Sequence, residues 1–355
     1  MRIIKKIFFL QIVLLFACVF ADAQWQKQTI DTKASLRGLS VVSEKIIWAS
    51  GTGGTFLKTT DGGKSWTIGK VPGAEKLDFR DVEAFDAQTA YLLSIGEGEN
   101  SRIYKTTDGG ASWKMQFKNT NPKAFFDAIA FWDKNNGIAM SDPVDGKYLL
   151  MTTSDGETWK PLANDKMPPA KDGEAAFAAS GTCLITSGKS DVFLVSGGSQ
   201  ARVFRSNNRG LSWFVSDTPI VKGTAGSGIF SIAMFDRKKG VIVGGNYEKP
   251  NEAGNNLAFT NDGGKTWTLA KGLTGYRSGA AYIDKKTIIA VGSGGYDYSL
   301  DGGKKWRSDN PPDDQYKDFN AVQAKGKNAV WAVGANGLVA RFIGNVTVKG
   351  AVITR

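Results

Sequence analysis

The sequence contains no histidine, and this absence excludes more chemistry than any other feature of the composition. Without histidine there is no Ser–His or Cys–His nucleophile pair, no usual acid–base group at neutral pH and no example of the commonest metal ligand. Cysteine is almost as scarce, with two residues in 355. Cys18 lies in the leader described next, so a processed chain keeps only Cys183. We therefore expect no intrachain disulfide, no cysteine-bound zinc, no other metal and no cofactor.

Residues 1–23 have the features of an export signal. Three basic residues within the first six positions precede an apolar run over residues 7–20. Ala21 and Ala23 then place small side chains at the −3 and −1 positions of a cleavage site. We expect cleavage before Gln24 and export to the periplasm or the extracellular space.

Apolar runs long enough to span a membrane are missing from the rest of the chain. The leader is too short to remain as a transmembrane helix, and no later segment has about 20 consecutive apolar residues. A lipid anchor at Cys18 is disfavoured, because Phe16 is bulky for a lipoprotein signal and the apolar leader continues beyond the cysteine. Residues 24–355 are expected to form a single domain, and we expect it to be a monomer.

The chain carries a formal net charge of +11, but the excess is scattered. No block of five or six like charges occurs, and a dispersed surplus does not make the basic stripe of a nucleic-acid groove. We therefore expect no nucleic-acid partner.

Internal repetition is the dominant pattern of the sequence. Six octapeptides read Thr/Ser-x-Asp-x-Gly-x-Ser/Thr-Trp or a near variant, and successive tryptophans are 39 to 54 residues apart. Ser154 and Asn208 stand where the other boxes have aspartate, and Lys305 takes a hydroxyl position. The boxes are TTDGGKSW (59–66), TTDGGASW (106–113), TTSDGETW (152–159), SNNRGLSW (206–213), TNDGGKTW (260–267) and SLDGGKKW (299–306).

These boxes are expected to be structural turns. An Asp, Asn or Ser side chain accepts backbone N–H groups two residues on, the glycines take positive φ, and the tryptophan packs between neighbouring sheets. This predicts a hairpin between the third and fourth strands of a four-stranded unit. A calcium loop is the weaker alternative, since each box offers a single carboxylate. The residues given this structural role are Asp61, Trp66, Asp108, Trp113, Trp159, Trp213, Asp262, Trp267, Asp301 and Trp306.

Between the boxes, short β-rich runs follow in the same order in every unit. Counted from the innermost strand, seven units begin near residues 36, 79, 126, 177, 230, 276 and 319, the last without a box. The segment 25–30 is left over before the first unit. We expect it to close the ring by supplying or joining the outer strand of the last unit, which would protect exposed strand edges.

The boxes resemble the Asp-box (BNR) repeat of β-propellers. Over the whole mature chain, GEGENSRIYKTTDGG, FFDAIAFWD, SDPVDG, ARVFRS and GYRSG make the sequence similar to the photosystem II stability/assembly factor-like propellers. The resemblance implies an all-β, seven-bladed propeller with four-stranded blades and a non-enzymatic assembly factor of the periplasm or lumen. Asp-boxes also occur in sialidases and other glycosidases, which supply the competing class.

A binding site is expected on the face opposite the boxes. The first residues of the innermost strands align as an apolar, mostly aromatic residue followed by a variable one. Because strand side chains alternate between faces, we expect the apolar residue to wedge between blades and the variable one to face the channel mouth. A one-residue register error would invert this assignment. The residues expected at the mouth are Arg37, Arg80, Asp127, Ser231, Arg277 and Asn320.

Polar loops between the second and third strands are expected on the same face. Arginine forks pair with carboxylates and tyrosine offers rigid contact area, although ordinary solvation explains any single member equally well. The loop candidates are Glu97, Arg102, Asp142, Asn246, Tyr247 and Asp297.

Two functions remain open. The first is a secreted or periplasmic, non-catalytic propeller that binds another envelope or secreted protein, through a carboxylate-bearing group held by Arg37, Arg80 and Arg277. The second is a sialidase-type glycosidase, in which three arginines hold a substrate carboxylate and a Tyr/Glu pair supplies the nucleophile. For that pair the chain offers Tyr247 or Tyr276 with Glu97 or Glu248. The binding protein is favoured by the full-length resemblance, the lack of histidine and the mixed charge of the face.

Overall fold

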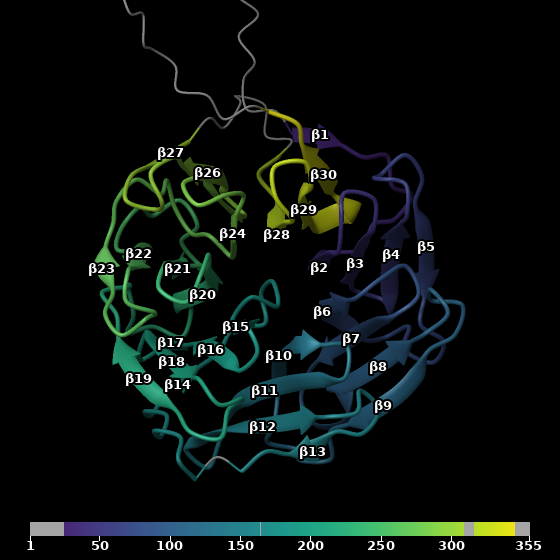
Figure 1. Cartoon of the computed structure of the whole chain (residues 1–355), viewed down its shortest axis with the longest axis horizontal. Coiled ribbons are helices and arrows are strands. Elements are labelled where there is room, and N and C mark those ends of the chain that lie inside the picture. The colour runs from purple at the N-terminus through teal and green to yellow at the C-terminus, as the bar shows by residue number, and fades with distance from the viewer. Residues whose placement is uncertain (1–24, 164, 309–315, 345–355) are drawn as a thin grey trace, which may run out of the picture.

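The structure, a computed structural model, describes residues 25–163, 165–308 and 316–344. Its strands form seven antiparallel sheets arranged as blades in a ring around a central channel (Figure 1). The predicted all-β, seven-bladed propeller is thereby confirmed. Helical structure in the described ranges consists of short 3-10 segments, which include η1 (Gly98–Asn100) and η3 (Ala335–Gly337). The predicted export signal, with Cys18, lies outside the described residues.

Each blade runs from an innermost strand at the channel to an outermost strand at the rim. Blade 1 contains β2 (Leu36–Val41), β3 (Ile47–Gly51), β4 (Thr55–Thr59) and β5 (Thr67–Lys70). Blade 2 contains β6 (Asp78–Ala84), β7 (Ala90–Ile95), β8 (Arg102–Thr106) and β9 (Lys114–Lys118). Blade 3 contains β10 (Phe126–Asp133), β11 (Asn136–Val144), β12 (Lys147–Thr153) and β13 (Lys160–Pro161). Blade 4 contains β15 (Leu184–Ser187), β16 (Asp191–Val195), β18 (Arg202–Ser206) and β19 (Phe214–Asp217). Blade 5 contains β20 (Ser227–Met234), β21 (Gly240–Asn246), β22 (Leu257–Thr260) and β23 (Thr268–Leu269). Blade 6 contains β24 (Gly279–Tyr282), β25 (Ile288–Gly292), β26 (Gly295–Ser299) and β27 (Trp306–Arg307). Blade 7 contains β28 (Phe319–Ala324), β29 (Val330–Gly334), β30 (Val339–Phe342) and β1 (Trp25–Lys27). Two short strands, β14 (Glu174–Ala175) and β17 (Gly197–Gly198), extend the sheet of blade 5.

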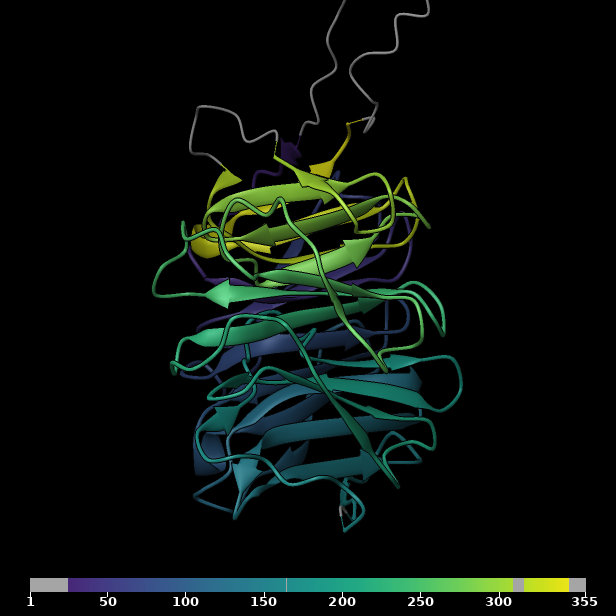
Figure 2. The same cartoon turned by 90° about the vertical axis from the view of Figure 1, so that its left-hand side faces the viewer.

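The strands run across the thickness of the ring, so the connecting loops gather on two opposite faces (Figure 2). The box turns and the turns between first and second strands share one face. For example, the N–H of Gly109 in the second box donates to the carbonyl of Gln88, and that of Gly263 in the fifth box donates to Lys238, both over 2.9 Å. We call this the box face and the opposite one the mouth face.

The box turns are held by hydrogen bonds of their aspartate or its substitute. In the first box, the hydroxyl of Thr59 donates to Asp61 over 2.8 Å, and Asp61 accepts the N–H of Ser65 over 3.0 Å. The Ser65 hydroxyl also donates to Asp61, and these bonds lower the pKa of that carboxyl to about 2. Trp66 then packs edge-on against Trp331 of blade 7, with the ring centroids 5.7 Å apart.

The third box is one residue shorter than its alignment suggested. Asp155, and not Ser154, accepts the hydroxyl of Thr153 and the N–H groups of Glu157 and Thr158. The turn therefore starts at Thr153 and keeps its aspartate. Counting eight residues back from Trp159 assigned the aspartate position to Ser154, because the shorter turn shifts every residue before the tryptophan by one position.

The ring closes through its amino-terminal strand. β1 pairs antiparallel with β30, which places Trp25 opposite Phe342. Trp25 is 3% exposed and packs against Phe342 and Phe319, with centroids 5.3 and 4.9 Å away. The expectation that this segment joins the last blade is met, and chain segments more than 300 residues apart in sequence share one sheet.

Candidate functional site

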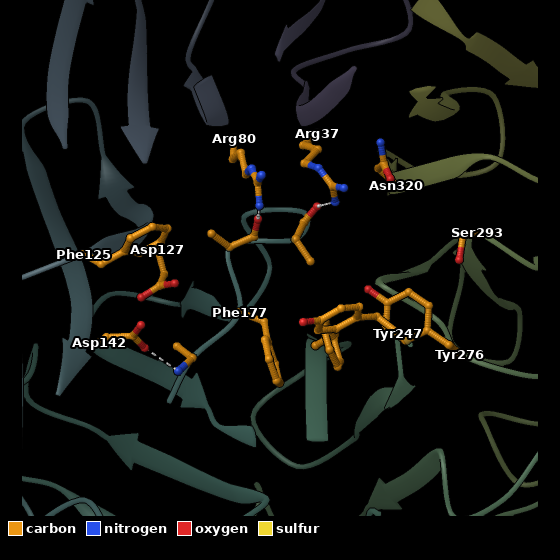
Figure 3. A pocket seen from close by; sticks show the side chains of 14 residues that line it. Arg37, Arg80, Phe125, Asp127, Asp142, Phe177, Tyr247, Tyr276, Ser293 and Asn320 are labelled. Carbon is orange, nitrogen blue, oxygen red and sulfur yellow. Dashed lines mark hydrogen bonds between the residues drawn. The ribbon is translucent and has the colours of Figure 1, made fainter. Parts of the chain in front are cut away.

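A cavity of about 510 Å³ opens at the channel mouth on the face opposite the boxes. We call it the mouth cavity; Figure 3 shows the side chains that line it. Of the candidates from the sequence, it brings together Arg37, Arg80, Asp127, Asp142, Tyr247 and Asn320.

A repeated β-bulge places one side chain from most innermost strands into this cavity. A bulge inserts one extra residue into a strand and turns its side chain out of the regular alternation. The register of the first two strands of a blade breaks around one residue in blades 1, 2, 3, 5 and 7. The bulge residues are Arg37, Arg80, Asp127, Phe230 and Asn320. All five line the mouth cavity.

Blade 5 shows that the alignment of the strand starts was displaced by one residue there. Its bulge residue is Phe230, which lines the cavity, whereas Ser231 is fully buried. The Ser231 hydroxyl accepts hydrogen bonds from Thr182 and from the N–H of Ala280. Ser231 is therefore an internal packing residue and does not face the mouth.

In blade 6 the alignment is displaced by one residue in the opposite direction, and Arg277 does not reach the mouth. A Cβ on Gly292 would lie 3.0 Å from the Cα of Arg277, as one on Gly51 would from the Cα of Leu36. Arg277 thus occupies the wedge position that Leu36 fills in blade 1. It is fully buried, and its Nη2 lies 2.6 Å from an oxygen of Asp297, itself a buried residue of β26. The mouth cavity therefore contains two of the three expected arginines. The third, Arg277, lies between blades and is paired with the carboxylate of Asp297.

The other loop candidates lie outside the lining of the mouth cavity. Glu97 and Arg102 flank η1, where the Arg102 Nε donates to the carbonyl of Glu99 over 2.6 Å. Asn246 ends β21 and its side chain accepts the N–H of Glu248. These contacts organise loops of blades 2 and 5.

Residues 176–182 cross the channel below the mouth cavity, and we call this segment the plug. It precedes β15, which begins seven residues later than the sequence alignment placed the fourth unit. In Figure 1 the loop before β15 reaches toward the centre of the ring. Its contacts reach four other blades, through Asp142, Arg80, Arg37 and Ser278.

The arginine pair, Arg37 and Arg80, holds the plug. Nη1 of Arg37 donates to the carbonyl of Ala179 and Nη1 of Arg80 to that of Ala178, each over 3.2 Å. Nε of Arg80 also donates to Asp78 over 2.8 Å. Burial, together with the neighbouring Arg80, lowers the pKa of Arg37. Each guanidinium has five N–H donors, so these contacts use only part of their capacity.

The acid pair, Asp127 and Asp142, lines the adjoining wall. Asp142 lies in β11, directly after Ser141, which pairs with Phe126 of β10. Its Oδ1 accepts the N–H of Ala176 over 2.7 Å. Burial raises the pKa of Asp142 to about 6. The pKa of Asp127 is raised by burial and by the Asp142 carboxylate.

The third wall is aromatic. Phe177 and Phe230 stack with centroids 3.9 Å apart and planes 4° apart. Tyr276 meets Phe230 edge-on, and Tyr247, which is 49% exposed, stands over both phenylalanines from the long loop of blade 5. We expected Phe177, Phe230 and Tyr276 to wedge between blades, but all three line the mouth cavity. Phe230 is the bulge residue of β20, Phe177 belongs to the segment before β15, and Tyr276 precedes β24. The residue types do not mark any of these differences.

A second cavity of about 220 Å³ lies on the other side of the plug, toward the box face. Ser180, Gly181 and Thr182 of the plug line it, together with the carboxylates of Asp81 and Glu83. We call it the lower cavity. Within the described ranges, no group of three or more Cys, Asp or Glu side chains could hold a metal ion. The same residues include no helix with the length and apolar character of a membrane span.

No protein-family model and no curated protein matches the sequence. Solved structures match over nearly the whole chain. YCF48 bound to a D1 peptide has a TM-score of 0.66 at 16% identity, covering 90% of this chain and 95% of that one. YCF48 from Cyanidioschyzon merolae has a TM-score of 0.64 at 19% identity, covering 90% and 98%. U3-55K has a TM-score of 0.61 at 12% identity, covering 89% and 97%. At such identities the likeness shows the fold alone.

Proposed function

We propose that this chain is a non-catalytic propeller of the periplasm or extracellular space that binds a segment of another envelope protein in the mouth cavity. The observation that carries the proposal is the arginine pair at the wall of a 510 Å³ cavity. Arg37 and Arg80 are half-buried neighbours of like charge, and the pKa of Arg37 is lowered by burial and by the charge of Arg80. An anionic group between them relieves the repulsion. We assign that role to the carboxyl-terminal carboxylate of the partner segment, bound by the remaining guanidinium N–H groups.

Three further features support a protein partner. The aromatic wall offers rigid apolar area beside the charges, which is the composition of a recognition centre. The sequence resembles assembly-factor propellers, and a YCF48 propeller of the same fold binds a D1 peptide. The leader at residues 1–23 indicates export, which would place the protein among envelope partners.

The glycosidase alternative is weakened by the position of Arg277. Sialidase-type binding of a carboxylate needs three arginines around one group, and the mouth cavity is lined by two. The third candidate is fully buried and paired with Asp297.

The proposal is tested with a display library of random peptides whose carboxyl termini are free. We expect the purified protein to select peptides, and amidation of their carboxyl terminus to weaken binding at least tenfold. The double variant Arg37→Gln/Arg80→Gln should lose the difference between free and amidated peptides, because its side chains no longer carry the charge.

Two controls separate binding from folding. Arg237→Gln removes an arginine that pairs with Asp191 on the box face and should bind as wild type does. The thermal unfolding midpoint of the double variant must be measured, since both arginines also hold the plug. Equal affinity of wild type and a folded double variant, or a lack of any effect of amidation, would contradict the proposed function.

A further inference from the structure

The acid pair has no cationic partner among the described residues. Asp127 is 1% exposed, and its Oδ2 has no hydrogen-bond partner among the described residues. Asp142 spends one oxygen on the N–H of Ala176. Arg80 is the cation whose charge acts most directly on Asp127, yet its ion pair is made with Asp78. In the described ranges neither member of the acid pair lies within 4.0 Å of a lysine or arginine nitrogen.

In the free protein, protons compete with any cation for this pair. Burial raises the pKa of both carboxyl groups, and the Asp142 carboxylate raises that of Asp127 further, so a bound cation would stabilise the ionised form that the empty site disfavours. A buried polar atom without a partner costs free energy that a hydrogen-bond donor from a ligand would recover. An ammonium or guanidinium group supplies both the charge and the donors.

The surroundings suit an organic cation. Figure 3 shows Phe177 between the acid pair on one side and Tyr247 and Tyr276 on the other. The ring of Phe177 is partly exposed in the cavity wall, and aromatic rings attract cations through their negative faces. Two carboxylates are too few for a dedicated metal site, which in proteins draws on more oxygen ligands.

We infer that Asp127 and Asp142 form a second subsite of the mouth cavity, which takes the ammonium or guanidinium group of a basic side chain. This inference rests on the proposed function and adds the partner's chemistry to it. The partner segment carries a positive side chain within a few residues of its carboxylate. Opposite charges on adjoining walls then fix its direction in the cavity, because the reversed segment would meet like charges.

The test uses the peptides selected by the wild-type protein. Each lysine is replaced by Nε-acetyl-lysine and each arginine by citrulline, which keep the shape and remove the charge. We expect a basic residue at a constant distance from the carboxyl terminus, and at least a tenfold loss of affinity when it is neutralised. In the variant Asp127→Asn/Asp142→Asn this loss should vanish, while amidation of the carboxyl terminus still weakens binding.

The two ideas fail in different ways. If neutralisation has no effect on wild-type binding and amidation still does, the cation subsite is excluded and the arginine site stands. If neutralisation matters and amidation does not, the arginine site is excluded instead. Asp236→Asn is the matched control, because Asp236 caps a turn at the box face through the N–H groups of Lys238 and Lys239.

A second measurement does not depend on peptide selection. Nα-acetyl-arginine amide carries the cation without a carboxylate, and its binding is followed by NMR titration at pH 7.5. We expect saturable shifts with the wild-type protein and at least a tenfold weaker response in the double aspartate variant. A flat titration, or the same response in the folded variant, overturns the inference.

Discussion

Asp81 is a carboxylate placed almost out of reach of water, in the innermost strand of blade 2. It is 3% exposed, and its Oδ2 accepts the N–H of Ile129 of blade 3 over 2.8 Å. Glu83 follows two residues later and lines the same lower cavity. Burial raises the pKa of Asp81 to about 7, and burial together with the Asp81 charge raises that of Glu83.

These raised values predict that stability falls as the pH rises. The unfolded chain releases the Asp81 proton near pH 4, whereas the folded chain keeps it to about pH 7. The stabilisation is therefore complete below pH 4 and is lost as the pH rises through 7. Asp81→Asn cannot ionise, so its stability relative to wild type should increase between pH 4.5 and 8 by on the order of 1 kcal/mol or more.

Urea unfolding of both proteins at the two pH values provides the measurement. Asp236→Asn serves as the control, because backbone N–H groups hold the pKa of Asp236 below its usual value and it stays ionised in this range. An equal gap between Asp81→Asn and wild type at pH 4.5 and 8 would show that Asp81 is not protonated in the folded protein.

Single residues also show where sequence reasoning stops. Arg37, Arg80, Asp127 and Asn320 line the mouth cavity, but a bulge in each strand places them there and not the regular alternation of side chains. Arg277 does not, because the alignment was one residue off in its blade and one residue exchanges the two sides of a strand. The residue types do not reveal a bulge, since an arginine next to an aromatic residue fits either register.

At the scale of elements, the plug is the part of the chain that repetition could not foresee. The boxes and the short β runs predicted seven blades, because every blade repeats the same turn chemistry. The fourth innermost strand begins only at Leu184, since residues 176–182 fill the channel instead of starting a sheet. A segment that departs from the repeat has no pattern of its own, and its contacts come from blades distant in sequence.

The plug has a glycine where it packs against Asp81 of blade 2. Gly181 has φ of 74°, and a Cβ there would lie 2.3 Å from Oδ1 of Asp81. Gly181→Ala should therefore lower the free energy of unfolding by about 2 kcal/mol or more, from backbone strain plus the clash. Gly73→Ala is a matched control, since Gly73 has the same φ but no heavy atom within 4 Å of its Cβ position.

Denaturant unfolding of the two glycine variants isolates the clash, because the cost of positive φ is common to both. If Gly181→Ala and Gly73→Ala lose the same stability, the plug is not packed against Asp81 as described.

For the whole molecule, the decisive contact is the one that turns an open row of blades into a ring. β1 covers the edge of β30, and Trp25 fills the space between the rings of Tyr296, Phe319 and Phe342. The sequence predicted this closure from an unassigned strand before the first unit. An unpaired β30 would expose a free strand edge, which favours association between molecules.

Trp25→Ala should cost about 3–5 kcal/mol of stability, as expected for a buried tryptophan reduced to a methyl group. It should also increase the fraction of oligomers seen by size-exclusion chromatography with light scattering. Gln26→Ala, at an exposed position of the same strand, should behave as wild type. An unchanged unfolding midpoint for Trp25→Ala would mean that the ring is held closed by other contacts.

The plug makes the centre of the ring a dead end. The mouth cavity and the lower cavity lie on opposite sides of it and are lined by different residues of the same short segment. A polypeptide bound at the mouth cannot thread through the ring, so it must enter and leave the cavity from the mouth face. A carboxyl-terminal segment of the partner can do this without being cut, and release needs no disassembly of either protein. The box face lies on the opposite side of the ring, so a molecule that docked there would not compete for the mouth cavity.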